Sequence, residues 1–149
     1  MIFLANRHLL QPFMAWKANS PHLNHLQTLE QTQYDSLETI RERQFDALRG
    51  IVSHAAQTVP YYRQRWGQAA LGLNSLRTLD DLGQFPVLTK ADIRANAEEL
   101  RSDAYRNASV FEKTTSGSTG VPLTVVWNKE SKAWKQACTL RSDQWSGWR

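Results

Sequence analysis

The first half of the chain places apolar residues three and four positions apart, which is the spacing of an amphipathic helix. This spacing extends from about Asp35 to Gln57 and is carried by Leu37, Ile40, Leu48, Ile51, Val52 and Ala55. Asp35, with Glu38 three residues later, resembles an arrangement that satisfies the free amides at a helix start, and Pro60 ends the region. We therefore predict one long helix over these residues.

A second, shorter helix is predicted after Thr89. The Thr89 hydroxyl is suited to capping the first turn, in which Asp92 falls. One apolar stripe follows, made of Ile93, Ala97 and Leu100. Loops between the two helices are marked by Gly67, Gly72 and Gly83.

The pattern changes near Ser109. Residues 109–115 and 123–127 have the β-branched and aromatic content of strands. The segment that connects them, residues 116–122, contains glycines and a proline that prevent it from pairing as a strand. Ser131 is then expected to cap a long helix with a stripe of Trp134, Cys138, Arg141, Trp145 and Trp148. The predicted fold class is α/β for a complete domain and α+β for this chain. It has a helical region over about residues 1–108, then a β-loop-β hairpin and a helix over about 109–149.

Composition removes several classes of protein. The chain has 149 residues, 41% of them hydrophobic, and its 18 Lys and Arg against 14 Asp and Glu give a net charge of +4. A single cysteine, Cys138, rules out an internal disulfide. The basic residues form no run, so we expect no nucleic-acid partner. No stretch approaches the ~20 apolar residues of a membrane span, and no secretion signal is recognised, so we expect a cytoplasmic protein.

Several side chains have a chemical and a structural interpretation. His22 and His25 are spaced as metal ligands could be, but no Cys or acidic cluster completes a set, so no metal site is predicted. Cys138 is predicted to be a small core residue. The tryptophan stripe is predicted to be a helix face buried against a sheet that lies outside this chain, with an aromatic acyl pocket as the alternative.

The segment from Thr114 to Gly120 carries the clearest chemistry. It holds five hydroxyls and two glycines within seven residues. Glycines let the backbone approach a ligand so that successive amides form an anion nest, and hydroxyls add donors. This composition indicates a site that binds the polyphosphate of a nucleotide. It is not the common phosphate loop, because Gly117 and Gly120 are too close and no Lys follows. A hairpin loop without a ligand stays open as the alternative.

This segment, together with two others, resembles a known family. The run Thr-Ser-Gly-Ser-Thr-Gly-Val-Pro-Leu of residues 115–123 is similar to the phosphate-binding signature of adenylate-forming enzymes. The nearest branch is that of phenylacetate–CoA ligase, the deazaflavin-coenzyme adenylating synthetases and CapK-like capsule biosynthesis proteins. Residues 59–63 (Val-Pro-Tyr-Tyr-Arg) and 85–94 agree in order and spacing, and the resemblance spans about Thr32 to Arg149. Leu123 stands where many such enzymes have Lys, which points to the CapK-like branch and leaves the acyl substrate open.

The resemblance implies an ATP-dependent ligase. A carboxylate would attack the α-phosphate of magnesium-bound ATP, release pyrophosphate and leave an acyl-adenylate, whose acyl group then passes to CoA or another acceptor. The implied phosphate contacts are Thr115, Ser116, Gly117, Ser118, Thr119 and Gly120, with Lys113 as a further candidate. The family's adenine pocket and catalytic lysine lie beyond this loop. The chain is therefore expected to be an incomplete N-terminal portion of an AMP-binding domain.

Two functions remain open at this level. As an enzyme part, the chain would contain no catalytic residue of its own and would need the remainder of the polypeptide or a complementing chain for activity. The alternative is a non-catalytic truncated paralogue that serves as an interaction or carrier-binding module.

Overall fold

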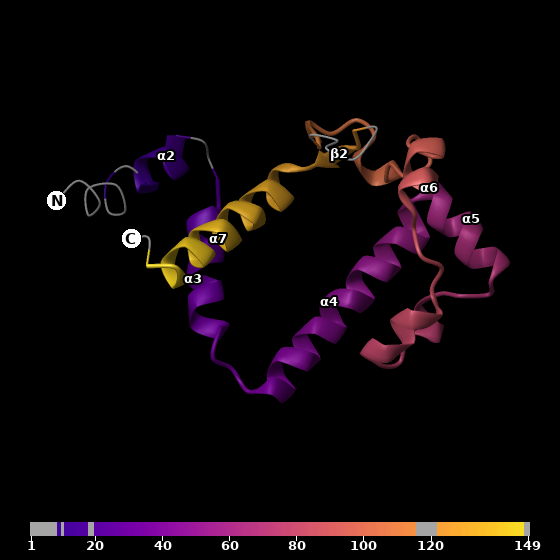
Figure 1. Ribbon diagram of the computed structural model, residues 1–149, viewed down its shortest axis with the longest axis horizontal. Coiled ribbons are helices and arrows are strands. Elements are labelled where there is room, and N and C mark those ends of the chain that lie inside the picture. Colours follow the sequence, from indigo (N-terminus) through magenta and orange to yellow (C-terminus); the bar gives the residue numbers. More distant parts are fainter. Residues whose placement is uncertain (1–8, 10, 18–19, 116–121, 148–149) are drawn as a thin grey trace. The chain divides into compact units, whose positions relative to one another are not determined.

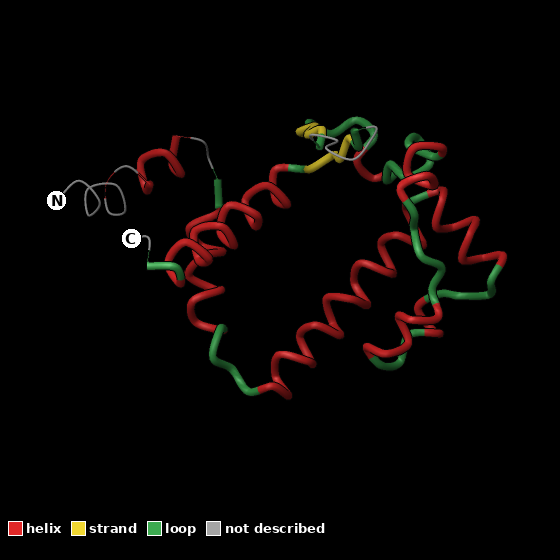
Figure 2. The backbone as a smooth tube through the Cα atoms, in the orientation of Figure 1, coloured by secondary structure: helices red, strands yellow, loops and turns green. Residues whose placement is uncertain are grey.

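The computed structural model describes residues 9, 11–17, 20–115 and 122–147. The described chain is mostly helical and contains one small antiparallel sheet of two strands (Figures 1 and 2). It divides into two compact units. The hairpin unit takes its described residues from Met1–Asp35, Ser109–Thr114 and Thr124–Arg149, and the long-helix unit takes its own from Ser36–Ala108 and Thr115–Leu123. The mixed helical and strand content agrees with an α+β chain.

The helices and strands follow one another along the chain as labelled in Figure 1. The α-helices are α2 (Gln11–Lys17), α3 (His22–Thr32), α4 (Leu37–Thr58), α5 (Pro60–Gln68), α6 (Lys90–Ala95) and α7 (Lys129–Trp145). Among the described residues, three short 3₁₀ helices cover Leu73–Ser75, Leu79–Gln84 and Asp103–Tyr105. The strands are β1 (Phe111–Thr114) and β2 (Thr124–Trp127). No helix among the described residues is long and apolar enough to cross a membrane.

The long helix predicted from Asp35 is α4, but its cap is Ser36 rather than Asp35. The Ser36 hydroxyl accepts a hydrogen bond from the Thr39 amide at 3.2 Å. Pro60 starts α5 as well as following α4, since a proline lacks only an amide proton that the first turn does not use. Gly67 lies within α5 rather than in a loop.

The core of the long-helix unit is formed where α4 and α5 meet the segment that follows them. Its buried members are Val52, Ala55, Trp66, Leu76 and Phe85. Thr89 and Asp92 form the predicted cap of α6 reciprocally, because the Asp92 amide donates to the Thr89 hydroxyl and the Thr89 amide donates to the Asp92 carboxylate. The prediction of this helix start is confirmed.

The hairpin unit joins segments that are far apart in sequence. In Figure 1, α7 lies against α3, and α7 buries Ala133 and Ala137 completely. Gln144 of α7 donates from Nε2 to the Glu30 carboxylate at 2.8 Å, and Trp145 donates from Nε1 to the Gln33 side chain at 3.0 Å. Small alanines let two helix backbones approach closely, so the polar side chains around them meet as well.

Two predictions about α7 are corrected by this packing. The helix is capped by Asn128, whose side chain accepts a hydrogen bond from the Ser131 amide at 2.7 Å, and not by Ser131. Cys138 is exposed and is not a core residue, because the buried face of α7 runs through Ala133 and Ala137. Trp134 and Trp145 are exposed by 37% and 64% in this chain, and their burial against a sheet outside it stays a prediction. Trp148 lies outside the described residues.

Candidate functional site

Of the six predicted phosphate contacts in residues 115–120, Thr115 is the one that lies within the described chain, and it follows β1 directly. The other five predicted contacts lie outside the described residues; they are Ser116, Gly117, Ser118, Thr119 and Gly120. The structure therefore defines the base of the predicted loop.

The base of the loop is held by hydrogen bonds between its two ends. The strands pair in antiparallel register, with Phe111 opposite Trp127 and Thr114 opposite Thr124. The hydroxyls of Thr114 and Thr124 share a hydrogen bond of 3.1 Å. At the next pair, the Thr115 amide donates to the Leu123 carbonyl at 2.9 Å, and the Leu123 amide donates to Thr115 Oγ1 at 3.0 Å. Both ends of the segment 116–122 are thus fixed side by side.

This arrangement assigns a structural task to Thr115. Its hydroxyl accepts the Leu123 amide proton and so replaces an acceptor in the strand ladder. A hydroxyl that accepts one bond still has its own proton to donate. Thr115 is therefore able to close the base of the segment and to donate a hydrogen bond to an anion.

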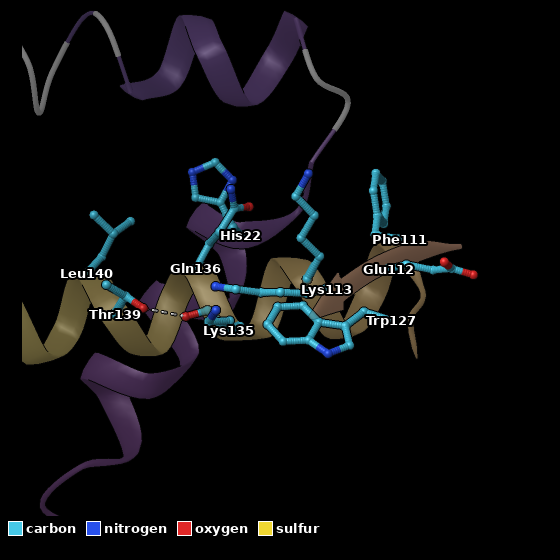
Figure 3. A pocket seen from close by; sticks show the side chains of 10 residues that line it. His22, Phe111, Glu112, Lys113, Trp127, Lys135, Gln136, Thr139 and Leu140 are labelled. Carbon is cyan, nitrogen blue, oxygen red and sulfur yellow. Dashed lines mark hydrogen bonds between the residues drawn. The ribbon is translucent and has the colours of Figure 1, made fainter. Parts of the chain in front are cut away.

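Lys113, the further candidate for a phosphate contact, lines an open pocket of about 590 Å³ in the hairpin unit (Figure 3). The pocket is bounded by both strands, by α7 and by the first residue of α3. Its lining residues that carry polar or charged groups are His22, Glu112, Lys113, Lys132, Lys135, Gln136 and Thr139. Sequence reasoning did not identify this pocket.

Aromatic rings hold two of the pocket's lysines in place. The Lys132 Nζ lies 4.1 Å from the centre of the Phe111 ring, and the Lys135 Nζ lies 4.3 Å from the centre of the Trp127 ring. A cation over a ring face is attracted by the ring quadrupole. Phe111 and Trp127 are opposite each other in the strand register, so the hairpin presents both rings to α7.

Two groups of the pocket have shifted protonation equilibria. Partial loss of hydration lowers the pKa of the Lys135 ammonium, and the positive charge of Lys113, within hydrogen-bonding reach, lowers it further. Burial lowers the pKa of His22, to which the neighbouring His25 also contributes. His22 is only 6% exposed, and its Nδ1 lies 3.0 Å from the Ser20 hydroxyl.

His25 belongs to the α3–α7 contact. Its ring stacks on Trp134 with centres 4.0 Å apart. Its Nε2 lies 2.9 Å from the Glu130 carboxylate, but the two groups are not aligned as a hydrogen bond. Within the part of the chain that the structure describes, no three His, Cys, Asp or Glu side chains gather as metal ligands.

The chain is similar in sequence to several ligases. No family model matches it. A phenylacetate-coenzyme A ligase of Aromatoleum evansii is 29% identical over 116 residues, which are 77% of this chain and 26% of the relative. Ligases of the same name from Pseudomonas putida and Escherichia coli K12 are 35% and 33% identical over 78 residues, which are 52% of this chain and 18% of each relative.

These matches confirm that the chain is related to adenylate-forming enzymes. Within them, its relationship is with phenylacetate–coenzyme A ligases, one of the groups that the loop signature indicated. The matched region spans about a quarter or less of the length of these relatives. The nearer likeness to CapK-like proteins stays a prediction.

Proposed function

We propose that this chain supplies the phosphate-binding loop of an ATP-dependent ligase that activates a carboxylate as an acyl-adenylate. The observation that carries the proposal is the closed base of the loop, where Thr115 and Leu123 hold together the ends of a segment rich in hydroxyls and glycines. The sequence relationship to phenylacetate-coenzyme A ligases supports the same chemistry. The complete protein would use ATP and Mg²⁺ in the cytoplasm, with CoA as a candidate acceptor.

The loop would act by positioning and by electrostatics. A carboxylate oxygen forms a bond to the α-phosphorus, the bond from that phosphorus to the bridging oxygen breaks, and pyrophosphate leaves with the electron pair. Amides and hydroxyls of residues 115–120 would donate hydrogen bonds to the β- and γ-phosphate oxygens, where negative charge increases. Fixed loop ends reduce the conformational freedom that would otherwise be lost when ATP binds.

The remaining steps need groups outside this chain. The acyl substrate, the acceptor and the catalytic lysine would be handled by the remainder of the polypeptide or by a complementing chain. Phenylacetate is the acid named for the relatives, and it is the first substrate to test. Other aryl and alkyl acids should be tested beside it, since Leu123 departs from the signature of many adenylate-forming enzymes.

Exchange of pyrophosphate with ATP tests the proposal in the complete protein. Carboxylate-dependent exchange should fall about 100-fold or more in a Ser118→Ala and Thr119→Ala double variant, because each lost donor to a developing charge slows such steps by about that factor. Ser142→Ala, an exposed serine on α7, is the matched control and should keep full exchange. Undiminished exchange in the double variant would contradict the loop assignment. No exchange with any acid in the wild-type protein would favour the non-catalytic module.

A further inference from the structure

Three lysines line the pocket of the hairpin unit, and they come from two different elements. Lys113 comes from β1, while Lys132 and Lys135 lie one turn apart on α7. In Figure 3 the Lys113 side chain extends toward Lys135. Like charges at hydrogen-bonding separation repel, and the lowered pKa of Lys135 reflects this repulsion in part.

The surrounding residues do not neutralise these charges. Among the described residues, no carboxylate forms an ion pair with any of the three lysines. Glu112 lines the pocket, but its carboxylate points away from Lys113 and Lys135 in Figure 3. The polar neighbours that remain are Gln136, Thr139 and the buried His22. The Thr139 hydroxyl already donates to the Lys135 carbonyl at 3.0 Å.

Two of the lysines, Lys132 and Lys135, are also held in position before any ligand arrives. The rings of Phe111 and Trp127 each carry one ammonium group on their faces, at 4.1 and 4.3 Å. A lysine that is free in solvent loses side-chain entropy when it binds, and a lysine already held over a ring loses less of it. The pocket is therefore organised to receive negative charge.

We propose that this pocket of the hairpin unit, built by residues of β1, β2 and α7, binds the phosphate group of a small molecule. A phosphate dianion offsets two of the positive charges and offers acceptor oxygens to both Lys113 and Lys135, whereas a carboxylate offsets only one charge. The bound dianion relieves the repulsion between Lys113 and Lys135. The proposal rests on Lys113, Lys132 and Lys135 and not on the proposed role of residues 116–120.

Calorimetric titration of the full chain with inorganic phosphate and with pyrophosphate tests the site at low salt. Lys135→Gln and Lys113→Gln should each weaken binding about tenfold, since each removes one charge-assisted hydrogen bond. Lys90→Gln, an exposed lysine on α6, is the matched control and should bind as the wild type does. Lys135→Arg should retain binding, which separates loss of charge from loss of fold. Acetate should bind more weakly than phosphate.

A second readout follows the lysine itself. The pKa of Lys135, measured by NMR, should rise when phosphate is added, because a bound anion favours the charged form. The Ser118→Ala and Thr119→Ala double variant should keep phosphate binding in the pocket even where it loses exchange. Equal binding in Lys135→Gln and wild type, no binding at millimolar phosphate, or an unchanged Lys135 pKa would overturn the proposal.

Discussion

The chemistry of single residues in the hairpin unit centres on groups that are charged or titratable but partly removed from water. His22 is the most buried of them, at 6% exposure, and its lowered pKa follows first from that burial and then from His25. The folded chain therefore binds a proton at His22 less readily than the unfolded chain does. Folding stability and pH are linked through this difference.

The direction of the pH effect follows from that link. Between the lowered pKa of folded His22 and its ordinary value of 6.5, the unfolded chain holds more protons, so stability rises with pH through this window. The contribution of His22 is complete above pH 6.5 and is lost as the pH falls toward the lowered value. His22→Gln should flatten the pH dependence over this range. Urea unfolding of both proteins at several pH values between about 5 and 7.5 measures it. An equally steep dependence in the variant would contradict the assignment.

Individual helices show how far local sequence determines structure. The start of α6 is held by the reciprocal bonds of Thr89 and Asp92. The Thr89 hydroxyl and amide also lower the pKa of the Asp92 carboxyl. Both residues were identified from spacing alone, because a capping box is defined within four consecutive residues.

Removal of this cap should weaken the long-helix unit measurably. Thr89→Ala is expected to lower the free energy of unfolding by about 1 kcal/mol, the usual effect of losing an N-cap hydroxyl. Thr89→Ser keeps the hydroxyl and should stay close to the wild type. In Thr89→Ala the pKa of Asp92 should also move up toward its ordinary value, as NMR titration would show. A stable variant with an unshifted Asp92 pKa would show that the box contributes little.

The element-scale predictions failed where a structure depends on partners distant in sequence. The long helix, α6 and both strands were predicted, since their periodicity and capping signals are local. Helix α3 was missed, because its polar sequence forms no clear apolar stripe and its packing partner α7 lies about a hundred residues later. The caps Ser36 and Asn128 were displaced by one and three residues from those expected, because several neighbouring side chains were equally able to cap.

The candidate sites divide in the same way. The loop of residues 115–120 was visible as composition, and its flanking strands followed from β propensity. The lysine pocket was not visible, because it depends on the register that sets Phe111 opposite Trp127 and on the rotation of α7. The three-residue spacing of Lys132 and Lys135 was the one signal in the sequence, and it also fits an ordinary solvated helix face.

At the scale of the whole molecule, the hairpin unit is assembled from the two ends of the described chain. Its centre is the close approach of α3 and α7, where Ala137 has no exposed surface. Cys138, the next residue, is exposed. Neighbouring positions on one helix therefore differ sharply in how much space surrounds them.

This difference gives a matched pair of substitutions. Ala137→Leu should lower the free energy of unfolding by about 1–3 kcal/mol, because the larger side chain must displace α3. Cys138→Leu introduces the same side chain at an exposed position and should change stability by no more than about 0.5 kcal/mol. Urea unfolding of both variants measures the effect. Equal destabilisation by the two would mean that α7 is rotated from the orientation described above.

The hydrogen-bonded base formed by Thr115 and Leu123 has a consequence for how the loop tolerates change in length. Once its ends are fixed, a flexible segment contributes to stability mainly through loop-closure entropy, which grows only with the logarithm of its length. Lengthening the segment 116–122 by two residues should cost about 0.2 kcal/mol on this basis. The fold therefore places almost no restriction on the number of residues in this loop. Under the proposed function, a restriction on the length would come from the phosphates that the loop would bind.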